Sequence, residues 1–295
     1  MTDWKISKIL FWADSYLKQH HIKSSRLIVE LLLSHCLCIK RVDLYINHDR
    51  LLSKKELHDF KSAIKRRINN EPLEYIIGKK GFFESELKVS RHTLIPRFDT
   101  EILIEQAIKS LKAFSKKNPT KTFLKVLELG TGSGAIIISL AKIFPEHIYF
   151  ASDVSFKALK VAKQNSIDIT KNRISFFASS WFSSIKKNKQ FDLIVSNPPY
   201  IPSDDIDNLE LQIKKFEPLK ALDGGKDGLA SFRNILKNAH YYLDFGSDIL
   251  LEIGFDQKIS IKKLVSKYPE YRIIEFVKDL AGHYRVVRLQ KDCNW

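Results

Sequence analysis

Residues 123–134 have the sequence Phe-Leu-Lys-Val-Leu-Glu-Leu-Gly-Thr-Gly-Ser-Gly. The mainly apolar first part predicts a buried strand, and the glycines that follow predict a tight turn into a helix. A turn of this kind brings the free N–H groups of a helix N-terminus close to a bound anion. Asp153 follows the next predicted strand and is placed to hydrogen-bond ribose hydroxyls. This stretch therefore predicts a cofactor site on an α/β sheet.

The glycine spacing fits two classes of cofactor. Gly130, Gly132 and Ala135 match the dinucleotide pattern of nicotinamide and flavin enzymes. The tighter spacing of Gly130, Gly132 and Gly134, preceded by Glu128, favours S-adenosyl-L-methionine. The loop by itself leaves both classes open.

Strands and helices alternate from this stretch to the end of the chain, which predicts a mainly parallel, doubly wound sheet with helices on both faces. Ligands of such sheets bind at the carboxyl ends of the strands. We expect strands at residues 123–129, 147–152, 174–178, 191–196 and 248–253, helices at 134–143, 158–164 and 229–243, and a final antiparallel hairpin at 272–277 and 284–289.

The first part of the chain has a different, helical pattern. Apolar residues recur at helical spacing through residues 6–17, 28–32 and 57–68, with Ser24 or Ser25 as the cap of the second helix and Ser53 with Glu56 as a capping box. We expect a small helical bundle at residues 1–75, a hairpin connector at 76–95 and an α/β domain at 96–295. The α/β domain is expected to begin with a helix near Asp99, followed by a polar loop at 115–122.

Asn197-Pro198-Pro199-Tyr200 follows the predicted strand 191–196. The Asn197 side-chain oxygen and the Pro198 carbonyl can accept the two N–H bonds of a planar NH2 group, and the Tyr200 ring can stack on that group. Amide and base nitrogens are weak nucleophiles, so a reaction at such a nitrogen requires it to be held and oriented. The same four residues are also compatible with a simple tight turn. A hydride-transfer enzyme has no need of this motif, so it favours the methyltransferase cofactor.

The composition indicates a cytoplasmic protein. No apolar stretch is long enough for a membrane span, and the N-terminal residues lack the apolar core of a secretory signal. The cysteines form no disulfide framework or zinc spacing, and we expect Cys36 and Cys38 to be buried. The net charge of +15 is compatible with an anionic partner such as nucleic acid, but the lysines are scattered and equally fit a biased composition.

With these motifs in place, residues 71–287 resemble the HemK/PrmC family of protein-(glutamine-N5) methyltransferases, which modify peptide chain release factors. The resemblance rests on Asn197–Tyr200 and on more specific segments at residues 72–78, 94–101, 217–222, 224–229, 252–254 and 279–282. Phe98, Ser180 and Tyr284 depart from the family pattern, and the first two are expected near the active site, where they would change cofactor affinity.

The resemblance implies a class I methyltransferase fold and assigns roles to individual residues. Asn197, Pro198, Pro199 and Tyr200 would hold the glutamine amide. Trp181 would cover the adenine ring, although it also fits a hydrophobic plug over the sheet. Glu128 would bind the methionine ammonium or cap the loop. The residues implied to contact S-adenosyl-L-methionine are Gly130, Thr131, Gly132, Ser133, Gly134, Asp153, Trp181 and Asn197.

The implied reaction is attack of a glutamine amide nitrogen, in a Gly-Gly-Gln-type loop of a release factor, on the cofactor methyl group. It requires no metal, and we expect the enzyme to be a monomer. The first alternative is an N6-adenine methyltransferase acting on DNA or RNA, which would use the same four residues on a flipped base. The second is a non-catalytic binding protein that keeps the cofactor fold.

Overall fold

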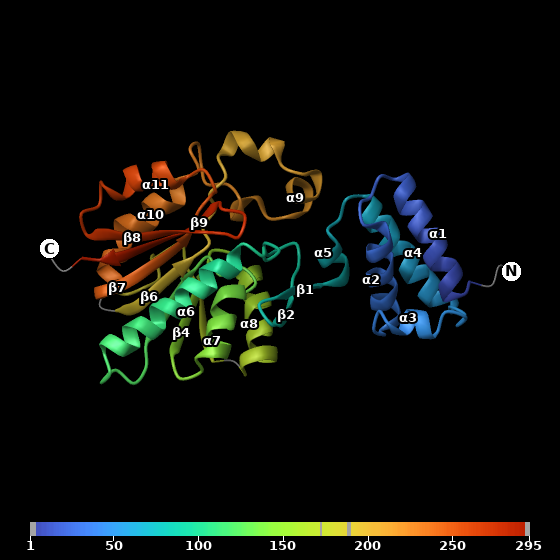
Figure 1. The fold of residues 1–295 in the computed structure, drawn as a ribbon, viewed down its shortest axis with the longest axis horizontal. Coiled ribbons are helices and arrows are strands. Elements are labelled where there is room, and N and C mark those ends of the chain that lie inside the picture. The colour runs from blue at the N-terminus through green and yellow to red at the C-terminus, as the bar shows by residue number, and fades with distance from the viewer. Residues whose placement is uncertain (1–3, 172, 188–189, 293–295) are drawn as a thin grey trace. The chain divides into compact units, whose positions relative to one another are not determined.

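The computed structural model describes residues 4–171, 173–187 and 190–292 (Figure 1). These residues form two compact units, and each is described by itself. The first unit contains the described residues up to Lys79 together with Glu210–Phe216. The second contains Lys80–Leu209 and the described residues from Glu217 onward.

The first unit is helical, as its apolar periodicity predicts. One face of α1 buries Ile6, Ile9, Leu10, Ala13 and Leu17 in a core shared with α2 and α4. The burial of that apolar face drives the packing of the unit, because short helices have little stability of their own. Its helices are α1 (Ile6–Gln19), α2 (Ser25–Leu37), α3 (Asp43–Ile46), α4 (Lys54–Ile68), α5 (Leu73–Ile77) and α9 (Leu211–Phe216).

The predicted caps of this unit have different outcomes. The capping box is confirmed, because the Ser53 hydroxyl accepts from the Glu56 N–H and the Glu56 carboxylate accepts from the Ser53 N–H. The side-chain cap of α2 was predicted wrongly. Ser24 precedes α2 in a left-handed conformation with no capping hydrogen bond, and the Ser25 hydroxyl donates to Asp14 Oδ1 at 2.5 Å. The Ser25 hydroxyl therefore bonds to a side chain of α1 rather than to the first turn of its own helix.

The prediction that both cysteines of α2 are buried is half wrong. Cys36 is half-buried, whereas Cys38 is exposed. Cys38 is the residue that ends α2 and has a φ of 53°. Cys293 lies outside the described residues.

The second unit is built on a seven-stranded sheet with the order β5-β4-β3-β6-β7-β9-β8 (Figure 1). The first five strands in this order are parallel, and β9 pairs antiparallel with both β7 and β8. The strands are β3 (Lys125–Leu129), β4 (Ile148–Asp153), β5 (Ile174–Ala178), β6 (Phe191–Ser196), β7 (Leu243–Glu252), β8 (Tyr271–Lys278) and β9 (Tyr284–Lys291). This arrangement confirms the predicted fold class.

The topology places a ligand site at the boundary between β3 and β6. The chain moves outward from β3 through β4 to β5, then returns to the other side of β3 at β6. Leu129 and Ser196, the last residues of β3 and β6, are paired in the sheet, and the Ser196 hydroxyl donates to the Leu129 carbonyl at 2.7 Å. The glycine loop and the Asn197 motif therefore leave the sheet side by side at its topological switch point.

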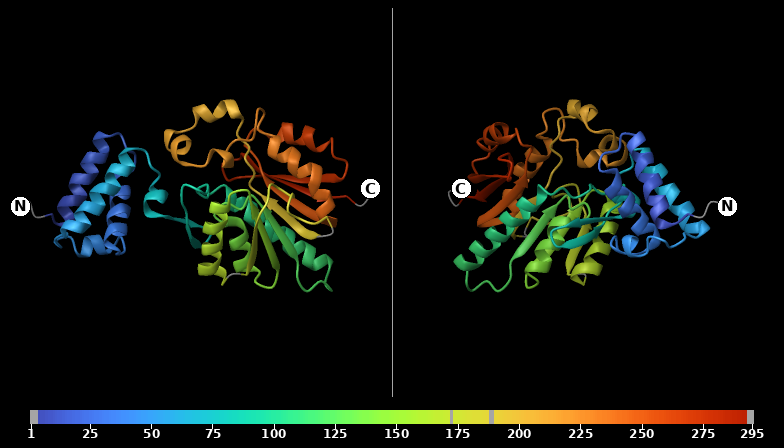
Figure 2. Two further views of the ribbon diagram at one scale, coloured as in Figure 1. Left: turned by 180° about the vertical axis from the view of Figure 1, so that it is seen from behind. Right: turned by 45° about the vertical axis from the view of Figure 1, so that its right-hand side comes forward.

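Helices cover both faces of this sheet (Figure 2). On one face lie α6 (Thr100–Lys117), α7 (Ala135–Ile143) and α8 (Phe156–Thr170), and on the other lie α10 (Ala230–Ala239) and α11 (Lys258–Val265). Successive strand residues alternate between the two cores, with Val126 packed on one face and Leu127 on the other. The central strand β6 is buried along its whole length, whereas the edge strands β5 and β8 are partly exposed. Among the described residues, none of the helices combines the length and the apolar character that a membrane crossing needs.

Smaller elements connect these layers. The expected hairpin or extended connector contains β1 (Lys79–Phe82) and β2 (Ser85–Lys88), which form a two-stranded sheet. Between β6 and α10 lie the 3₁₀ helices η1 (Ser203–Asn208) and η2 (Leu219–Ala221), and η3 (His240–Tyr242) follows α10.

Several predicted boundaries in this unit were wrong. The helix predicted at residues 229–243 is α10, which ends at Ala239 and is followed by η3. Helix α8 continues to Thr170 rather than ending at 164, because the Asn165 amide bonds to the backbone of Lys88 and Ser133. Helix α6 continues to Lys117, into the predicted polar loop. Strand β7 begins at Leu243, because Leu243 pairs with β6. Contacts of Asn165 and the pairing of Leu243 thus extend α8 and β7 beyond the bounds that their local sequence predicts.

Candidate active site

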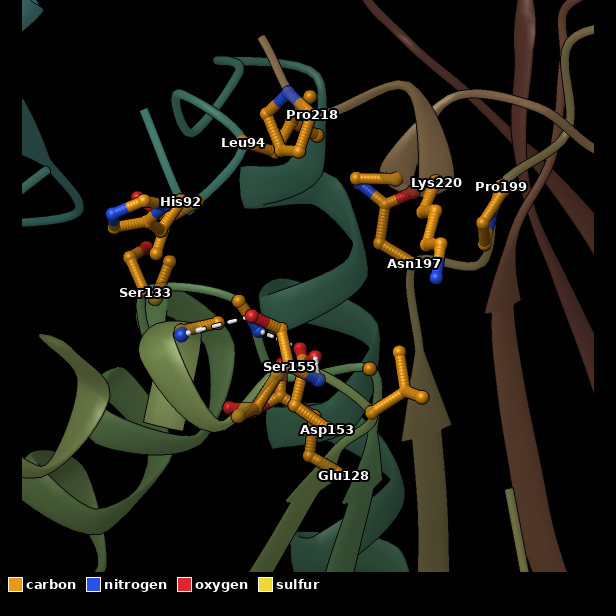
Figure 3. A pocket seen from close by; sticks show the side chains of 18 of the residues that line it. His92, Leu94, Glu128, Ser133, Asp153, Ser155, Asn197, Pro199, Pro218 and Lys220 are labelled. Carbon is orange, nitrogen blue, oxygen red and sulfur yellow. Dashed lines mark hydrogen bonds between the residues drawn. The ribbon is translucent and has the colours of Figure 1, made fainter. Parts of the chain in front are cut away.

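A cavity of about 510 Å³ lies at the carboxyl edge of the sheet, within the size range of small-molecule sites (Figure 3). Its walls come from the loops after β3, β4, β5 and β6, from residues 91–100 and from residues 218–221. All of these segments belong to the second unit. The cavity therefore lies where the fold predicts a ligand.

The glycine loop forms the floor of this cavity. Gly130 and Gly132 have φ values of 70° and 55°, and a Cβ atom on either would meet nothing within 4 Å. Both residues line the cavity together with Thr131 and Ser133. Gly134 does not line the cavity, and a Cβ there would lie 2.7 Å from Ile138 Cδ1 in α7 and 3.3 Å from Ala162 Cβ in α8, so its small size permits close packing of these helices.

Asp153 ends β4 and lines the cavity beside the glycine loop (Figure 3). Its Oδ2 accepts from the Gly132 N–H at 2.9 Å, and its Oδ1 accepts from the Ser155 N–H at 2.8 Å. Burial raises the pKa of Asp153, and these N–H donors oppose the rise. The carboxylate thus fixes the loop, and its remaining lone pairs can accept from a ligand hydroxyl.

Glu128 is almost completely buried beneath the same loop and still contributes to the cavity wall. Its Oε2 accepts from the Thr131 hydroxyl at 2.5 Å and from the Ile137 N–H at 3.2 Å. Burial raises the pKa of Glu128 to about 8, with a smaller contribution from Asp153. Glu128 therefore does cap the start of α7, and it is also the acidic group that a ligand cation in this cavity would meet.

Trp181 lines the cavity from the segment after β5, and its ring also packs against the core of the sheet. It has a φ of 53°, which is unusual for a residue with a bulky side chain. The Ser179 hydroxyl supports this backbone by donating to the Trp181 carbonyl at 2.8 Å. Of the two departures expected near the site, Ser180 lines the cavity, whereas Phe98 is 68% exposed and is not part of the wall.

The Asn197 motif borders the cavity through Asn197 and Pro199, and Pro198 and Tyr200 are not among the wall residues (Figure 3). Asn197 Nδ2 donates to the hydroxyl of Thr100 at 3.2 Å. Within the described part of the chain, no hydrogen bond ends on Asn197 Oδ1 or on the Pro198 carbonyl. Asn197 Oδ1 is therefore an unpaired acceptor on a cavity-lining residue, and the Pro198 carbonyl is an unpaired acceptor on a buried residue outside the wall.

The segment that begins at Gly224 packs closely against the backbone of Pro199 and Tyr200. Gly228 has a φ of 70°, and a Cβ atom there would lie 2.4 Å from the Tyr200 carbonyl oxygen. Gln257 Nε2 donates to the Tyr200 carbonyl at 3.0 Å and to the Gly228 carbonyl at 3.2 Å. Sequence analysis identified Gly228 only by resemblance and did not identify Gln257, because no local pattern links it to position 200.

Glu217 belongs to the segment 217–222 that the resemblance singled out, but the sequence assigned it no role, and it lies just outside the cavity wall. Glu217 is buried and accepts from the Ile95 N–H at 3.2 Å and from Arg97 at 2.5 Å, which ties residues 95–97 to the segment 217–221. Arg91 and Lys220 also line the cavity and carry positive charge. Their only sequence signal was proximity to segments singled out by resemblance, in a chain where basic residues are frequent.

The side chains of the cavity match the groups of S-adenosyl-L-methionine. Glu128 and Asp153 are acidic partners for its ammonium and ribose hydroxyls, and Trp181 offers an aromatic surface for its adenine. At the start of α7 the Ile137 N–H is bonded to Glu128, whereas helix geometry leaves the N–H groups of the cavity-lining Ala135 and Ile136 without partners in the helix, where a carboxylate fits. Within the described part of the chain, no cluster of His, Cys, Asp and Glu is arranged to hold a metal ion.

Comparisons with known proteins agree with this geometry. Residues 8–78 match the family model of the PrmC N-terminal domain, and residues 108–212 match the methyltransferase small domain. A release factor glutamine methyltransferase from Thermodesulfovibrio yellowstonii is 40% identical over 88% of this chain and 90% of its own length. A second, from Buchnera aphidicola subsp. Schizaphis graminum, is 40% identical over 96% and 99%.

A solved structure shares the fold at low sequence identity. It is the crystal structure of the hMettl16 catalytic domain in complex with the MAT2A 3'UTR hairpin 6, with a TM-score of 0.52 and 13% identity over 82% of this chain and 84% of that one.

Proposed function

The chain belongs to the release factor glutamine methyltransferase family, and from this premise we propose that it transfers a methyl group from S-adenosyl-L-methionine to the side-chain amide nitrogen N5 of a glutamine in a peptide chain release factor. The observation that carries this proposal is the Asn197 motif, which leaves the sheet beside the glycine loop with two free acceptors. These acceptors match the two N–H bonds of a primary amide.

Membership of the family confirms several expectations from the sequence. The chain is a methyltransferase, its fold is the predicted doubly wound sheet with a C-terminal antiparallel hairpin, and its cofactor is S-adenosyl-L-methionine. The individual site residues, the boundaries of substrate contact and the monomeric state remain proposals.

The proposed cofactor contacts come from the loops at the carboxyl edge. When bound, S-adenosyl-L-methionine supplies an electrophilic methyl group. The backbone of residues 130–134 would bind its carboxylate, Asp153 its ribose hydroxyls and Trp181 its adenine. Gly134 supports this arrangement through helix packing and does not line the cavity.

The proposed substrate contacts come from the residues after β6. Asn197 Oδ1 and the Pro198 carbonyl would accept the two amide N–H bonds, and the Tyr200 ring would restrict the position of the amide plane. Holding a weak nucleophile in line for attack contributes up to about 7–11 kcal/mol in the best cases. The same two oxygens would stabilise the positive charge that develops on the attacking nitrogen.

We further propose that the helical first unit binds the body of the release factor. Several of its large apolar side chains are exposed, among them Phe11 and Ile46, which are 74% and 69% exposed. Arg41 and Lys65 on the same unit are exposed cations that could face an acidic partner. Residues 8–78, which match a family-specific model, coincide with this unit.

The test is transfer of a labelled methyl group to purified release factor, DNA and RNA in parallel. We expect label only on the release factor, and no label when the loop glutamine of the factor is replaced by glutamate, which has no NH2 group. Asn197→Ala should reduce transfer by orders of magnitude with the fold intact. Label on adenine in DNA or RNA, with none on the factor, would instead support the N6-adenine alternative.

A further inference from the structure

Asn165 is a buried polar residue in the middle of a helix, and its side chain takes no part in the function proposed above. It lies in α8, is 1% exposed and does not line the cavity. Its Nδ2 group donates to the Lys88 carbonyl at 3.0 Å and to the Ser133 carbonyl at 2.9 Å, and its Oδ1 accepts from the Lys88 N–H at 2.8 Å. Both N–H bonds and the oxygen of the amide are therefore used, and all of their partners are backbone groups.

The bond to Ser133 replaces a hydrogen bond that a regular helix would make. In an α-helix the Ser133 carbonyl would accept from the N–H of the residue four positions later, which is Ile137. The Ile137 N–H donates instead to Glu128 Oε2 at 3.2 Å, and among the described residues no backbone N–H bonds to the Ser133 carbonyl. Asn165 supplies the missing donor. Glu128 and Asn165 thus keep the end of the glycine loop outside the helix, where Ser133 lines the cavity.

The two bonds to Lys88 hold a second part of the cavity wall. Lys88 is the last residue of β2, and the chain continues from it into a turn at residues 90–93. This turn is closed by its own hydrogen bond, in which the Thr93 N–H donates to the Ser90 carbonyl at 2.9 Å. Residues 91–93 line the cavity. A side chain that fixes Lys88 therefore also restricts the position of this turn at the cavity.

The burial of the Asn165 amide is better explained by these two wall segments than by the helix. Asn is a poor helix former, so an apolar residue at a buried position would stabilise α8 more. A buried amide is costly unless its hydrogen bonds are made, and this one makes them with segments that border the cavity. Figure 3 shows His92, from the turn, and Ser133, from the glycine loop, on the same side of the cavity.

We propose that Asn165 is a positioning residue for the cofactor site, which joins the glycine loop to the turn at residues 90–93 and holds that side of the cavity in its binding form before S-adenosyl-L-methionine enters. The inference concerns the cofactor and holds whichever substrate is methylated. Without these bonds the loop and the turn would separate for part of the time. The apparent dissociation constant of the cofactor rises in proportion as the fraction of binding-competent molecules falls.

The test replaces Asn165 with residues of similar size. Asn165→Leu removes all three hydrogen bonds, whereas Asn165→Asp keeps the acceptor for the Lys88 N–H but places a second oxygen against two carbonyl groups. We expect the dissociation constant of S-adenosyl-L-methionine, measured by calorimetry without any substrate, to rise about ten-fold or more in both variants. The number of binding sites per molecule should stay that of the wild type, whereas a misfolded fraction would lower that number and leave the affinity unchanged.

Thr170→Val is the matched control. It removes a buried hydroxyl from the same helix, and among the described residues that hydroxyl bonds only to Ser166, within α8. The control should lower the melting temperature but keep the wild-type affinity for the cofactor. Wild-type affinity in Asn165→Leu would overturn the inference, and so would an equal loss of affinity in Thr170→Val.

Should neither variant at position 165 fold, hydrogen exchange in the wild-type protein decides. The Lys88 amide should exchange slowly without cofactor, because Asn165 Oδ1 accepts from it, and more slowly still when cofactor is bound. Exchange at the rate of an unbonded backbone amide, or a rate that the cofactor does not change, refutes the role of Asn165. Loss of cofactor affinity in the variants of a protein that methylates no release factor would support this inference and contradict the proposed function.

Discussion

Replacing Glu128 by Gln should stabilise the cofactor-free protein at alkaline pH. The ordinary pKa of a glutamate is 4.5, and burial raises that of Glu128 to about 8. The folded protein therefore holds this proton at pH values where the unfolded chain has lost it. Between these two values stability falls as pH rises, and above about pH 8 the loss is complete. At about 1.4 kcal/mol for each tenfold change in proton affinity, the full loss has an upper bound of about 5 kcal/mol.

The Gln variant lacks this loss but keeps the acceptor for the Thr131 hydroxyl and the Ile137 N–H. Urea unfolding at about pH 5 and about pH 9 measures the difference. We expect similar stabilities at the lower pH and a more stable variant at the higher pH. Glu105→Gln, at an exposed position of α6, is the control and should change neither value. A stability difference between Glu128→Gln and the wild type that does not vary with pH would refute the reasoning.

The same variant separates the two roles considered for Glu128. If its carboxylate binds the ammonium group of the cofactor, binding near neutral pH must ionise it and release a proton. Calorimetry in buffers of different ionisation enthalpy measures the number of protons released on cofactor binding. Glu128→Gln should abolish this proton release and weaken cofactor binding. If Glu128 only caps α7, the variant binds as tightly as the wild type and no difference in proton release is seen.

Three further predictions test other parts of the molecule. Gly228→Ala should lower both kcat and the melting temperature, because its Cβ would lie 2.4 Å from the Tyr200 carbonyl at a φ of 70°; unchanged kinetics would exclude the bracing role. Ser53→Ala should cost about 1 kcal/mol of stability, measured by urea unfolding, because the capping box is lost, with no effect on cofactor affinity. Ile46→Glu should raise KM for the release factor but not for the cofactor, while Ile259→Glu, at a position 80% exposed on the second unit, should leave both unchanged.

The sequence predicted the fold well where the local pattern and the tertiary structure agree. Strands β5 and β6 were predicted to the residue; β6 is a short apolar run buried on both faces, and β5 is an edge strand with an apolar sequence that is only partly buried. The end of α8 was missed because Asn165 and its polar neighbours favour a turn locally. In the structure Asn165 bonds to the backbone of residues 88 and 133, and the buried Ser166 and Thr170 follow it in the same helix. Such contacts join residues far apart in sequence, so no local pattern contains them.

In the candidate site, too, the sequence predicted residues that follow a local pattern and missed residues that depend on distant contacts. Gly130, Asp153 and Asn197 were found because each follows a predicted strand, and the ends of parallel strands share one edge of the sheet. Thr100 and Gln257 were not assigned roles, because each acts on a residue that is distant in sequence. Residues that line the cavity were therefore predictable from the sequence, whereas residues that hold them in place were not.

The two buried glutamates, Glu128 and Glu252, have similar positions in the sheet, similar pKa shifts and similar contacts. They lie in β3 and β7, the strands on either side of β6, and both have pKa values raised by burial. Each uses its carboxyl group to order a loop, since Glu128 bonds to Thr131 in the glycine loop and Glu252 bonds to Tyr200 in the Asn197 motif. In the cofactor-free protein both carboxyl groups lower the free energy of unfolding near and above neutral pH. A fold selected only for stability would place apolar residues at these buried strand positions. Their joint presence on the flanks of β6 is therefore best explained by preorganisation, in which stability is given up so that both loops are ordered before either ligand binds.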